Sequence, residues 1–381
     1  MIRRNAEARL TELARQFKAV AVVGPRQSGK TTLVRQVFRN KPYVSLENPD
    51  TRRFALEDPR SFLGTYPNGA ILDEAQRVPE IFSYLQQILD EDDTRGKFII
   101  TGSNNLLLQE SISQSLAGRI AYLFLLPFSI SEPDIKDTTL QELIFKGLYP
   151  PVYDQPVEPA KWYSDYIRTY VERDVRQIKN INDLNAFERF LRLCAGRTGQ
   201  LLNMSNLAIE TGVDNKTAAS WISLLETGYI TFRLQPHHMN FNKRLVKMPK
   251  LYFYDTGLVC ALLGIQDFSQ LTYHYMAGAL FENLIVSELL KTRYNNARNN
   301  NLFFWRDNVG HEIDILIENQ DQLFPVEIKS GKTITPDFFS GLLFWQKISN
   351  TKNGLVIYGG EEPQKRITGI NIIPWRKSWE I

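Results

Sequence analysis

The sequence predicts an α/β protein with more than one domain, in which an N-terminal parallel sheet precedes helices and a C-terminal α/β domain. Apolar runs of strand length recur between helical stretches in the first third of the chain, at 19–23, 43–46, 70–73, 97–101 and 122–126. Helical periodicity dominates the middle, and polar and apolar residues alternate after residue 310. A chain of 381 residues also exceeds one average domain.

The composition is that of a globular protein, because 43% apolar and 23% charged residues exclude a disordered or fibrous chain. No apolar run approaches the roughly 18 residues that span a bilayer, so we expect no membrane segment and a cytoplasmic location. The net charge of +3 is too small to indicate nucleic acid by itself. Cys194 and Cys260 stand among apolar residues without metal or redox spacing, which predicts two buried thiols.

The first predicted strand runs directly into GPRQSGKT, which fits the phosphate-binding P-loop pattern, and an amphipathic helix follows. Gly24 and Gly29 let the backbone curl so that its N–H groups face phosphates. We expect Lys30 to reach the β- and γ-phosphates of ATP, and the Thr31 hydroxyl to bind Mg²⁺. The predicted nucleotide-binding residues are Gly24, Pro25, Arg26, Gln27, Ser28, Gly29, Lys30, Thr31, Thr32 and Asp73.

A pair of acids ends the strand predicted at 70–73. We expect Asp73 to join Thr31 in holding Mg²⁺, and Glu74 to orient or deprotonate the attacking water. The alternative is an ordinary strand followed by an acid at the start of a helix. Together with the P-loop, the acids predict a catalytic site at the carboxyl ends of the strands and a nucleotide-binding domain over residues 1–135.

Two further positions near this edge of the sheet are candidates. The strand at 97–101 ends in TGSNN, where Asn104 or Ser103 is expected to contact the γ-phosphate or the attacking water. A plain turn is the alternative, since Gly, Ser and Asn favour turns. Arg119 precedes the fifth strand and is either a surface residue or a group that neutralises charge in the transition state.

The middle of the chain predicts two segments. Residues 136–195 combine a proline-rich stretch, which indicates a linker, with a helical connector. Residues 196–255 predict a helix, a turn at Gly212, a second helix and a strand, which is the order of a winged helix-turn-helix. Trp221, Leu224 and Leu225 share the inner face of the second helix. The outward residues of that helix are Asn215, Lys216, Thr217 and Ser220.

DNA is the partner that this segment indicates, because those outward side chains can reach bases or phosphates. A basic stretch follows that contains Lys243, Arg244, Lys247 and Lys250 without one acid between Gln235 and Tyr254. The alternatives are a winged helix used for protein packing and a solvated basic loop.

The C-terminal segment 256–381 carries a second set of acids. If 311–317 is a strand, Asp314 lies on the face opposite the apolar residues, and a following strand places Glu327 and Lys329 beside it. Carboxylates are ligands for Mg²⁺ or Mn²⁺, and a lysine can stabilise charge on a phosphate. The spacing of Asp314, Glu327 and Lys329 resembles that of PD-(D/E)XK nucleases. That resemblance implies a further glutamate from a preceding helix, for which Glu282, with Glu288 as second choice, is the candidate that completes a second metal site. The alternative is a sheet with one solvated polar face.

Over nearly its whole length the chain resembles a family of prokaryotic AAA-superfamily ATPases. The matching stretches are VVGPRQSGKTTL, ILDEAQ, FIITGSNN, SLAGRIAYLFLLPFS, YVERDV, KRLVKMPKLYFYDTGL, GALFENLIVSELLK and GHEIDILIE…PVEIKSG. The resemblance implies an AAA-type P-loop domain, ATP binding and hydrolysis, and a C-terminal domain of unknown function built from a winged helix and a PD-(D/E)XK nuclease-like fold. Asp314 stands in EID, where the strict nuclease pattern has Pro-Asp.

The leading hypothesis is an Mg²⁺-dependent ATPase that couples its nucleotide state to a C-terminal module acting on DNA. Lys30, Glu74, Asn104, Glu327 and Lys329 are its candidate catalytic residues, and its candidate metal ligands are Thr31, Asp73, Glu282, Asp314 and Glu327. The alternatives are a nucleotide-controlled signalling switch and a DNA-binding regulator, each with an inactive nuclease-like domain. A homo-oligomer stays open.

Overall fold

The chain forms two compact units in the computed structural model, which describes residues 2–102, 112, 115–170, 183–238, 245–320, 322–366 and 369–381. The first unit comprises Met1–Phe128, Thr227–Tyr229 and Arg293–Asn299, and the second comprises the remaining three segments. The boundaries of the four domains expected from the sequence stay predictions. No helix in the described segments is long and apolar enough to cross a membrane.

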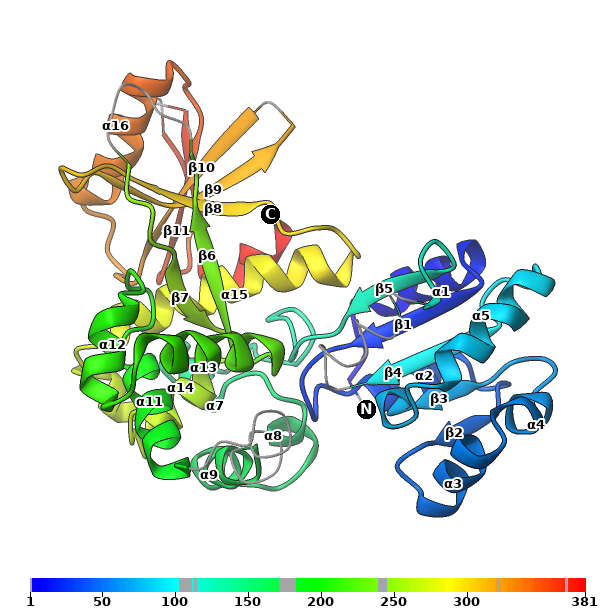
Figure 1. Cartoon of the computed structure of the whole chain (residues 1–381). Coiled ribbons are helices and arrows are strands. Elements are labelled where there is room, and N and C mark those ends of the chain that lie inside the picture. The colour runs from blue at the N-terminus through cyan, green and yellow to red at the C-terminus, as the bar shows by residue number, and fades with distance from the viewer. Residues whose placement is uncertain are drawn as a thin grey trace. The chain divides into compact units, whose positions relative to one another are not determined.

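The first unit is built on a parallel five-stranded sheet with the order β2-β3-β4-β1-β5 (Figure 1). Its strands are β1 (Ala19–Val23), β2 (Tyr43–Ser45), β3 (Ile71–Asp73), β4 (Phe98–Gly102) and β5 (Ile120–Phe124). All four strand pairs run parallel. The predicted α/β class and the five strands are confirmed. The ends of β1 are those expected, and the ends of the other strands lie within two residues of those expected.

Helices cover both faces of this sheet because its central strands are apolar on both sides. Every residue of β1 is buried, and alternate side chains enter different cores. Val20 and Val22 pack with α1 (Glu7–Gln16) and α2 (Lys30–Val37). The other core contains residues of α3 (Pro49–Glu57), α4 (Pro59–Gly64), α5 (Ile81–Glu91) and η1 (Ala75–Arg77). This alternation makes a three-layer arrangement with the loops gathered at the strand ends.

The second unit begins with helices. These are α7 (Leu140–Lys146), α8 (Pro151–Asp154), α9 (Pro159–Thr169), α11 (Leu184–Ala195), α12 (Met204–Thr211), α13 (Asn215–Thr227), α14 (Thr256–Leu262), η3 (Phe268–Thr272) and α15 (Ala277–Asn295). The proline-rich stretch that predicts a linker contains the buried Tyr149 and Val152, so it packs inside this unit. Cys194 and Cys260 are buried free thiols, as expected.

The expected helix-turn-helix elements are α12 and α13, joined through Gly212. The left-handed φ of 80° at Gly212 is readily adopted only by glycine, which explains the turn. On α13, Trp221, Leu224 and Leu225 are buried, which confirms the predicted inner face. Trp221 meets Phe187 of α11 edge-on, with ring centroids 5.2 Å apart. The use of these helices as a winged helix stays a prediction.

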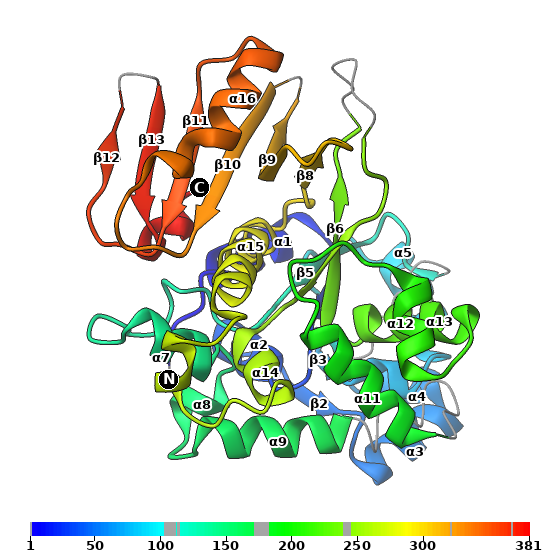
Figure 2. The same ribbon diagram turned by 90° about the vertical axis from the view of Figure 1, so that its left-hand side faces the viewer.

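An eight-stranded sheet with the order β12-β13-β11-β10-β9-β8-β6-β7 completes the second unit (Figure 2). Its strands are β6 (Thr231–Pro236), β7 (Lys250–Phe253), β8 (Leu302–Arg306), β9 (Glu312–Asn319), β10 (Gln322–Lys329), β11 (Gly354–Tyr358), β12 (Gln364–Lys365) and β13 (Ile370–Pro374). The predicted antiparallel hairpin is confirmed as β9 and β10, with Ile315 opposite Val326. The remaining helical segments are η4 (Pro336–Phe339), α16 (Ser340–Ser349) and η5 (Trp375–Glu380).

One side chain of helix α15 binds the backbone of β7 in the place that a neighbouring strand would otherwise take. The fully buried amide of Asn283 accepts from the Phe253 N–H at 2.7 Å and donates to the Phe253 carbonyl at 3.0 Å. A buried N–H without a partner destabilises a fold far more than an exposed one, since water cannot replace the lost bond. Asn283 therefore fixes the position of β7 against α15.

Replacing Asn283 with leucine should lower the free energy of unfolding by about 1–3 kcal/mol, because it keeps the side-chain size but removes both hydrogen bonds. Urea denaturation followed by circular dichroism measures the change. The matched control is Asn206→Leu, at an exposed position of α12 where only a change of about 0.5 kcal/mol or less is expected. Equal stability of the two variants would contradict the role given to Asn283.

Candidate functional site

The P-loop connects β1 to α2 in the first unit, as the sequence predicts. Gly24 has no room for a side chain, because a Cβ there would lie 2.1 Å from the Leu125 carbonyl oxygen. Gly29 has a φ of 89° and stands directly before the first helical residue, Lys30. The backbone thus reverses tightly at a helix N-terminus, where successive N–H groups favour anions.

A buried arginine that the sequence analysis missed holds this loop. Arg4 donates from Nη1 to the Ser28 carbonyl at 2.6 Å and from Nη2 to the Leu126 carbonyl at 2.7 Å. Its guanidinium also lies 4.9 Å from the ring centroid of Phe128. Arg4 therefore ties the P-loop to the segment after β5. No local pattern around Arg4, which precedes α1, distinguishes it from the other charged residues near the start of the sequence.

Lys30 lies inside the loop. Its side chain is 6% exposed, and Nζ donates to the carbonyls of Gly24 at 3.0 Å and Pro25 at 2.6 Å. Burial lowers the pKa of Lys30 to about 8, against the raising effect of the Glu74 and Asp73 carboxylates. Two carbonyls compensate a buried ammonium only in part, so a bound phosphate would stabilise its charged form.

Asp73 at the end of β3 receives donors from three segments. The Thr31 hydroxyl donates to Oδ1 at 3.0 Å, and the Thr101 hydroxyl of β4 donates to the same oxygen. The Tyr43 hydroxyl of β2 donates to Oδ2 at 2.6 Å. Burial, followed by the hydrogen bond to Asp73, raises the pKa of Tyr43 to about 12. The sequence analysis named Thr31 and Asp73 but missed Tyr43 and Thr101.

The residues at this edge fit a magnesium nucleotide. A hydroxyl and a carboxylate oxygen 3.0 Å apart, from Thr31 and Asp73, are the hard oxygen donors that Mg²⁺ prefers. The Ser28 hydroxyl is buried and finds no hydrogen-bond partner within the described segments. Glu74 has a left-handed φ of 55° and accepts from Gln76 Nε2 at 2.5 Å, which orients its carboxylate beside Asp73.

The remaining candidates of the first unit are less informative. Asn104 and Ser103 lie outside the described residues. Arg119 forms an ion pair with Asp90 of α5, with Nε 2.5 Å from Oδ1, and is partly exposed. That contact gives Arg119 a surface partner within its own unit.

The second unit brings together the acids and the lysine that the hairpin predicts. Lys329 Nζ lies 2.6 Å from Glu327 Oε2 and 3.9 Å from Asp314 Oδ2. Asp314 also accepts from the Ile328 N–H at 2.8 Å. Glu282 of α15 is close enough to contribute to the electrostatic environment of Lys329. The acids and the lysine that the sequence predicts to form one site therefore lie close to one another.

Four further residues join these to form the carboxylate cluster: Lys250, Tyr252, Arg306 and Glu312. Lys250 Nζ lies 3.0 Å from Glu282 Oε1 and 2.5 Å from Glu312 Oε1. The Tyr252 hydroxyl donates to Glu282 Oε1 at 2.5 Å, and Arg306 Nη1 lies 3.1 Å from Glu312 Oε2. Lys250 was expected in a basic stretch that meets phosphates, and this is wrong because its ammonium is buried among carboxylates.

The alternative of a solvated polar face does not hold at Glu327. Glu327 is 3% exposed, because α16 crosses over it at Gly341, where a Cβ would lie 2.3 Å from Glu327 Oε1. Burial, reinforced by the Asp314 carboxylate, raises the pKa of Glu327 well above its usual value. Oε1 finds no hydrogen-bond partner within the described residues.

The carboxylate cluster does not support the second metal ion expected from the sequence. No group of three or more His, Cys, Asp or Glu side chains in the described part of the chain is arranged to hold one. The reason is visible in the contacts, since lysine ammonium groups already lie against Glu282, Glu312 and Glu327. The residues here therefore do not fit the metal that the nuclease-like resemblance implies.

Glu288, the second choice upstream, has a structural role. It is fully buried, accepts from the Ile130 N–H at 3.0 Å and accepts a hydrogen bond from the Ser129 hydroxyl. Burial raises the pKa of Glu288 above its ordinary value. It stands three residues before Lys291 on α15 and binds the Ser129 hydroxyl and the Ile130 backbone rather than the carboxylate cluster.

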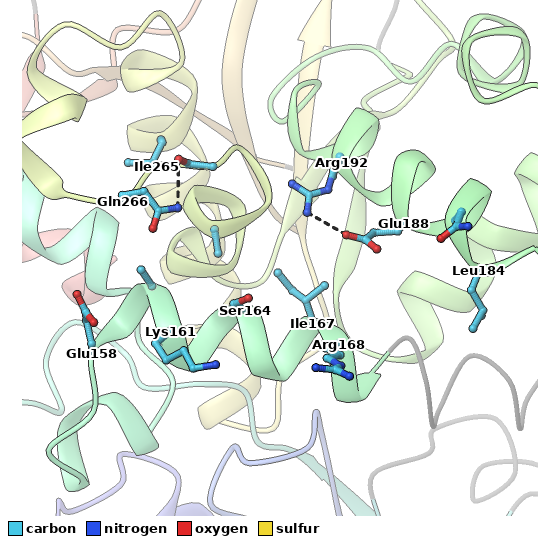
Figure 3. A pocket seen from close by; sticks show the side chains of 14 residues that line it. Glu158, Lys161, Ser164, Ile167, Arg168, Leu184, Glu188, Arg192, Ile265 and Gln266 are labelled. Carbon is cyan, nitrogen blue, oxygen red and sulfur yellow. Dashed lines mark hydrogen bonds and ion pairs between the residues drawn. The ribbon is translucent and has the colours of Figure 1, made fainter.

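A hollow of about 750 Å³ lies elsewhere in the second unit, between α9, α11 and the end of α14 (Figure 3). Its charged residues are largely paired along their own helices. Lys161 Nζ lies 2.8 Å from Asp165, and Arg192 Nη2 lies 2.9 Å from Glu188. We therefore assign this hollow no chemistry.

The parallel sheet, the glycine-bound loop and the paired acids at the strand ends define the first unit as a P-loop nucleotide-binding domain of the AAA type. Residues 16–133 match the family described as AAA domain. Residues 137–269 and 277–378 match two families described as domains of unknown function, DUF8612 and DUF4143. The second and third matches both fall in the second unit apart from a few residues.

Relatives cover most of the chain. Uncharacterized proteins of Mycobacterium tuberculosis and Mycobacterium bovis are each 32% identical over 339 residues, which cover 88% of this chain and 75% of theirs. The chain belongs to the family of these mycobacterial proteins. An uncharacterized protein of Haemophilus influenzae is 22% identical over 296 residues, with 72% of this chain and 68% of its own length covered.

Solved structures are more distant. A Walker-type ATPase of Pyrococcus abyssi is 15% identical with a TM-score of 0.47, over 68% of this chain and 94% of its own. RuvB of Thermotoga maritima is 14% identical with a TM-score of 0.32, over 60% of this chain and 88% of its own.

Nucleotide affinity should fall as the pH rises above 8. Phosphates bind the charged form of Lys30, and burial lowers the pKa of Lys30 to about 8. Above that pH the Lys30 amine is mostly neutral and has to take up a proton when the nucleotide binds, which weakens binding. The dissociation constant of a fluorescent ATP analogue should be about tenfold larger at pH 9 than at pH 7. In the control Lys30→Arg, whose charge does not titrate, the pH profile should be flat. A flat profile in the unaltered protein would contradict the lowered pKa.

Proposed function

We propose that the protein hydrolyses ATP with Mg²⁺ and couples its nucleotide state to DNA binding by the second unit. The observation that carries the first half is the contact between Thr31 and Asp73, which places a hydroxyl and a carboxylate 3.0 Å apart beside the P-loop. Glu74, the residue after Asp73, supplies an acid that is not used as a ligand. An AAA domain match over 16–133 supports the same activity.

Each residue has a definite task in this proposal. The loop N–H groups and Lys30 bind the phosphates, and Thr31 and Asp73 hold Mg²⁺, which neutralises charge on the phosphate oxygens when it is bound. Glu74, oriented by Gln76, accepts a proton from the attacking water. Tyr43 and Thr101 keep the Asp73 carboxylate in place through their hydroxyl groups. Arg4 holds the loop backbone.

Glu74→Gln should lower ATP turnover by about a hundredfold or more and leave nucleotide binding within a few fold, because it removes the base but not the phosphate contacts. Lys30→Ala should lose both. Phosphate release and analogue binding measured on the same samples separate the two effects. The control is Glu80→Gln, an exposed acid at the start of α5 that should leave turnover unchanged. Full turnover in Lys30→Ala would rule out hydrolysis at this P-loop.

DNA binding rests on the exposed side of α13. Asn215 and Lys216 are exposed at its start, and Lys247 is exposed in the stretch before β7. Asp214 caps this end of the helix by accepting from the N–H groups of Lys216 and Thr217. These side chains suit contacts to the phosphate backbone, which position a protein on DNA. Lys243 and Arg244 of the basic stretch lie outside the described residues.

The double variant Lys216→Ala/Lys247→Ala should weaken duplex DNA binding and lower its dependence on salt concentration by roughly one unit of log–log slope per lost phosphate contact. Mobility shift or anisotropy assays from 50 to 200 mM salt measure both. Linear, circular and single-stranded DNA should be bound but not cut in Mg²⁺ or Mn²⁺. Cutting that is lost on Asp314→Ala would show that the carboxylate cluster is catalytic, and salt-insensitive binding would contradict the phosphate contacts.

A further inference from the structure

We propose that Lys250 is the resident cation of the carboxylate cluster and takes the place that a divalent metal ion would need there. Its Nζ bridges two carboxylates from different elements, at 3.0 Å from Glu282 on α15 and 2.5 Å from Glu312 on β9. Joining acids from separate segments is the role that a metal ion has in an oxygen-ligand site. Here a side chain of β7 performs it.

The surrounding donors complete the neutralisation. Glu282 also accepts a hydrogen bond from the Tyr252 hydroxyl, and Glu312 Oε2 lies 3.1 Å from Arg306 Nη1. Glu327 is held by Lys329 at 2.6 Å, and Asp314 by a backbone N–H. A metal ion entering the carboxylate cluster would have to displace the buried ammonium group of Lys250 and the partly exposed ammonium group of Lys329. Positive charges at this range would repel it.

Lys250 is held in place by its backbone. In β7 it stands opposite Leu234 of β6, and on its other side it forms a bridge with Leu201. Its side chain is 5% exposed, and Nζ lies 5.7 Å from the centroid of the Phe304 ring. The ammonium group therefore cannot turn out to solvent without a change in the strand. A fixed cation of this kind is a permanent part of the site.

Removing that cation should create a metal site. Without Lys250, the negative charges of Glu282 and Glu312 would lose the ammonium group that lies between them. Asp314 and Glu327 lie beside these two acids, and the buried Oε1 of Glu327 has no hydrogen-bond partner within the described residues. Buried carboxylates without a counter-charge are stabilised by a divalent cation or by protons. The chemical class of ligand that would replace Lys250 is thus a hard, oxygen-binding cation such as Mg²⁺ or Mn²⁺.

The test counts Mn²⁺ bound to the full-length, nucleotide-free protein by electron paramagnetic resonance, in an Asp73→Asn background that removes the carboxylate ligand beside the P-loop. The parent should bind no Mn²⁺ that depends on Asp314. Lys250→Met should bind one additional Mn²⁺ per chain, and a further Asp314→Asn substitution should abolish it. The matched control Lys250→Arg keeps the positive charge and should gain no site.

Two results would overturn the proposal: Mn²⁺ bound by the parent and lost on Asp314→Asn, or a folded Lys250→Met protein that gains no site. If Lys250→Met does not fold, the parent and its Asp314→Asn variant still decide the first point, and Lys250→Gln replaces methionine for the second. The proposal does not depend on ATP hydrolysis. Lys250→Met with Asp73 intact should keep the parent turnover, whereas failure of the ATPase proposal would show as turnover insensitive to Lys30→Ala.

Discussion

The carboxylate of Asp73 is the contact on which the first unit depends. Its two oxygens receive hydroxyl groups from the start of α2, from β2 and from β4, so one side chain joins the P-loop helix to neighbouring strands. Parallel strands end at the same edge of a sheet, which makes such a meeting possible for residues far apart in sequence. Because β3 lies between β2 and β4 in the sheet, these two neighbouring strands supply the hydroxyl groups of Tyr43 and Thr101 that reach Asp73.

The second unit gathers several carboxylates in one place, and their negative charges need compensation. Its acids come from α15, β9 and β10, and they would repel one another in a buried position. Lys250 and Lys329 separate them, and Tyr252 supplies a further donor. The surrounding Tyr252 and carboxylates raise the pKa of Lys250 well above its usual value, even though burial alone acts to lower it. The carboxylate cluster is therefore neutralised mainly from within the protein.

The sequence predicts the elements well where the signal is local. The P-loop, Asp73 at a strand end and the β9–β10 hairpin each follow from a contiguous pattern, so the sequence alone predicts their residues. Long-range contacts leave no such pattern. Nothing near Tyr43 indicates that its hydroxyl meets Asp73. Lys250 belongs to a basic stretch of the sequence, although its ammonium is buried. Alternation placed Glu327 correctly beside Lys329 but could not show that α16 covers it.

Two buried lysines show why geometry must accompany a motif. Within the described residues, the hydrogen bonds of the Lys30 ammonium go to two carbonyl oxygens, and burial lowers its pKa to about 8, so its charge is incompletely compensated. A phosphate group would complete that compensation, which makes the position a site for an anion. Lys250 contacts two carboxylates, and its pKa is raised, so its charge is already compensated. The same side chain thus marks a ligand site in one unit and replaces a ligand in the other, according to the atoms that the fold places around it.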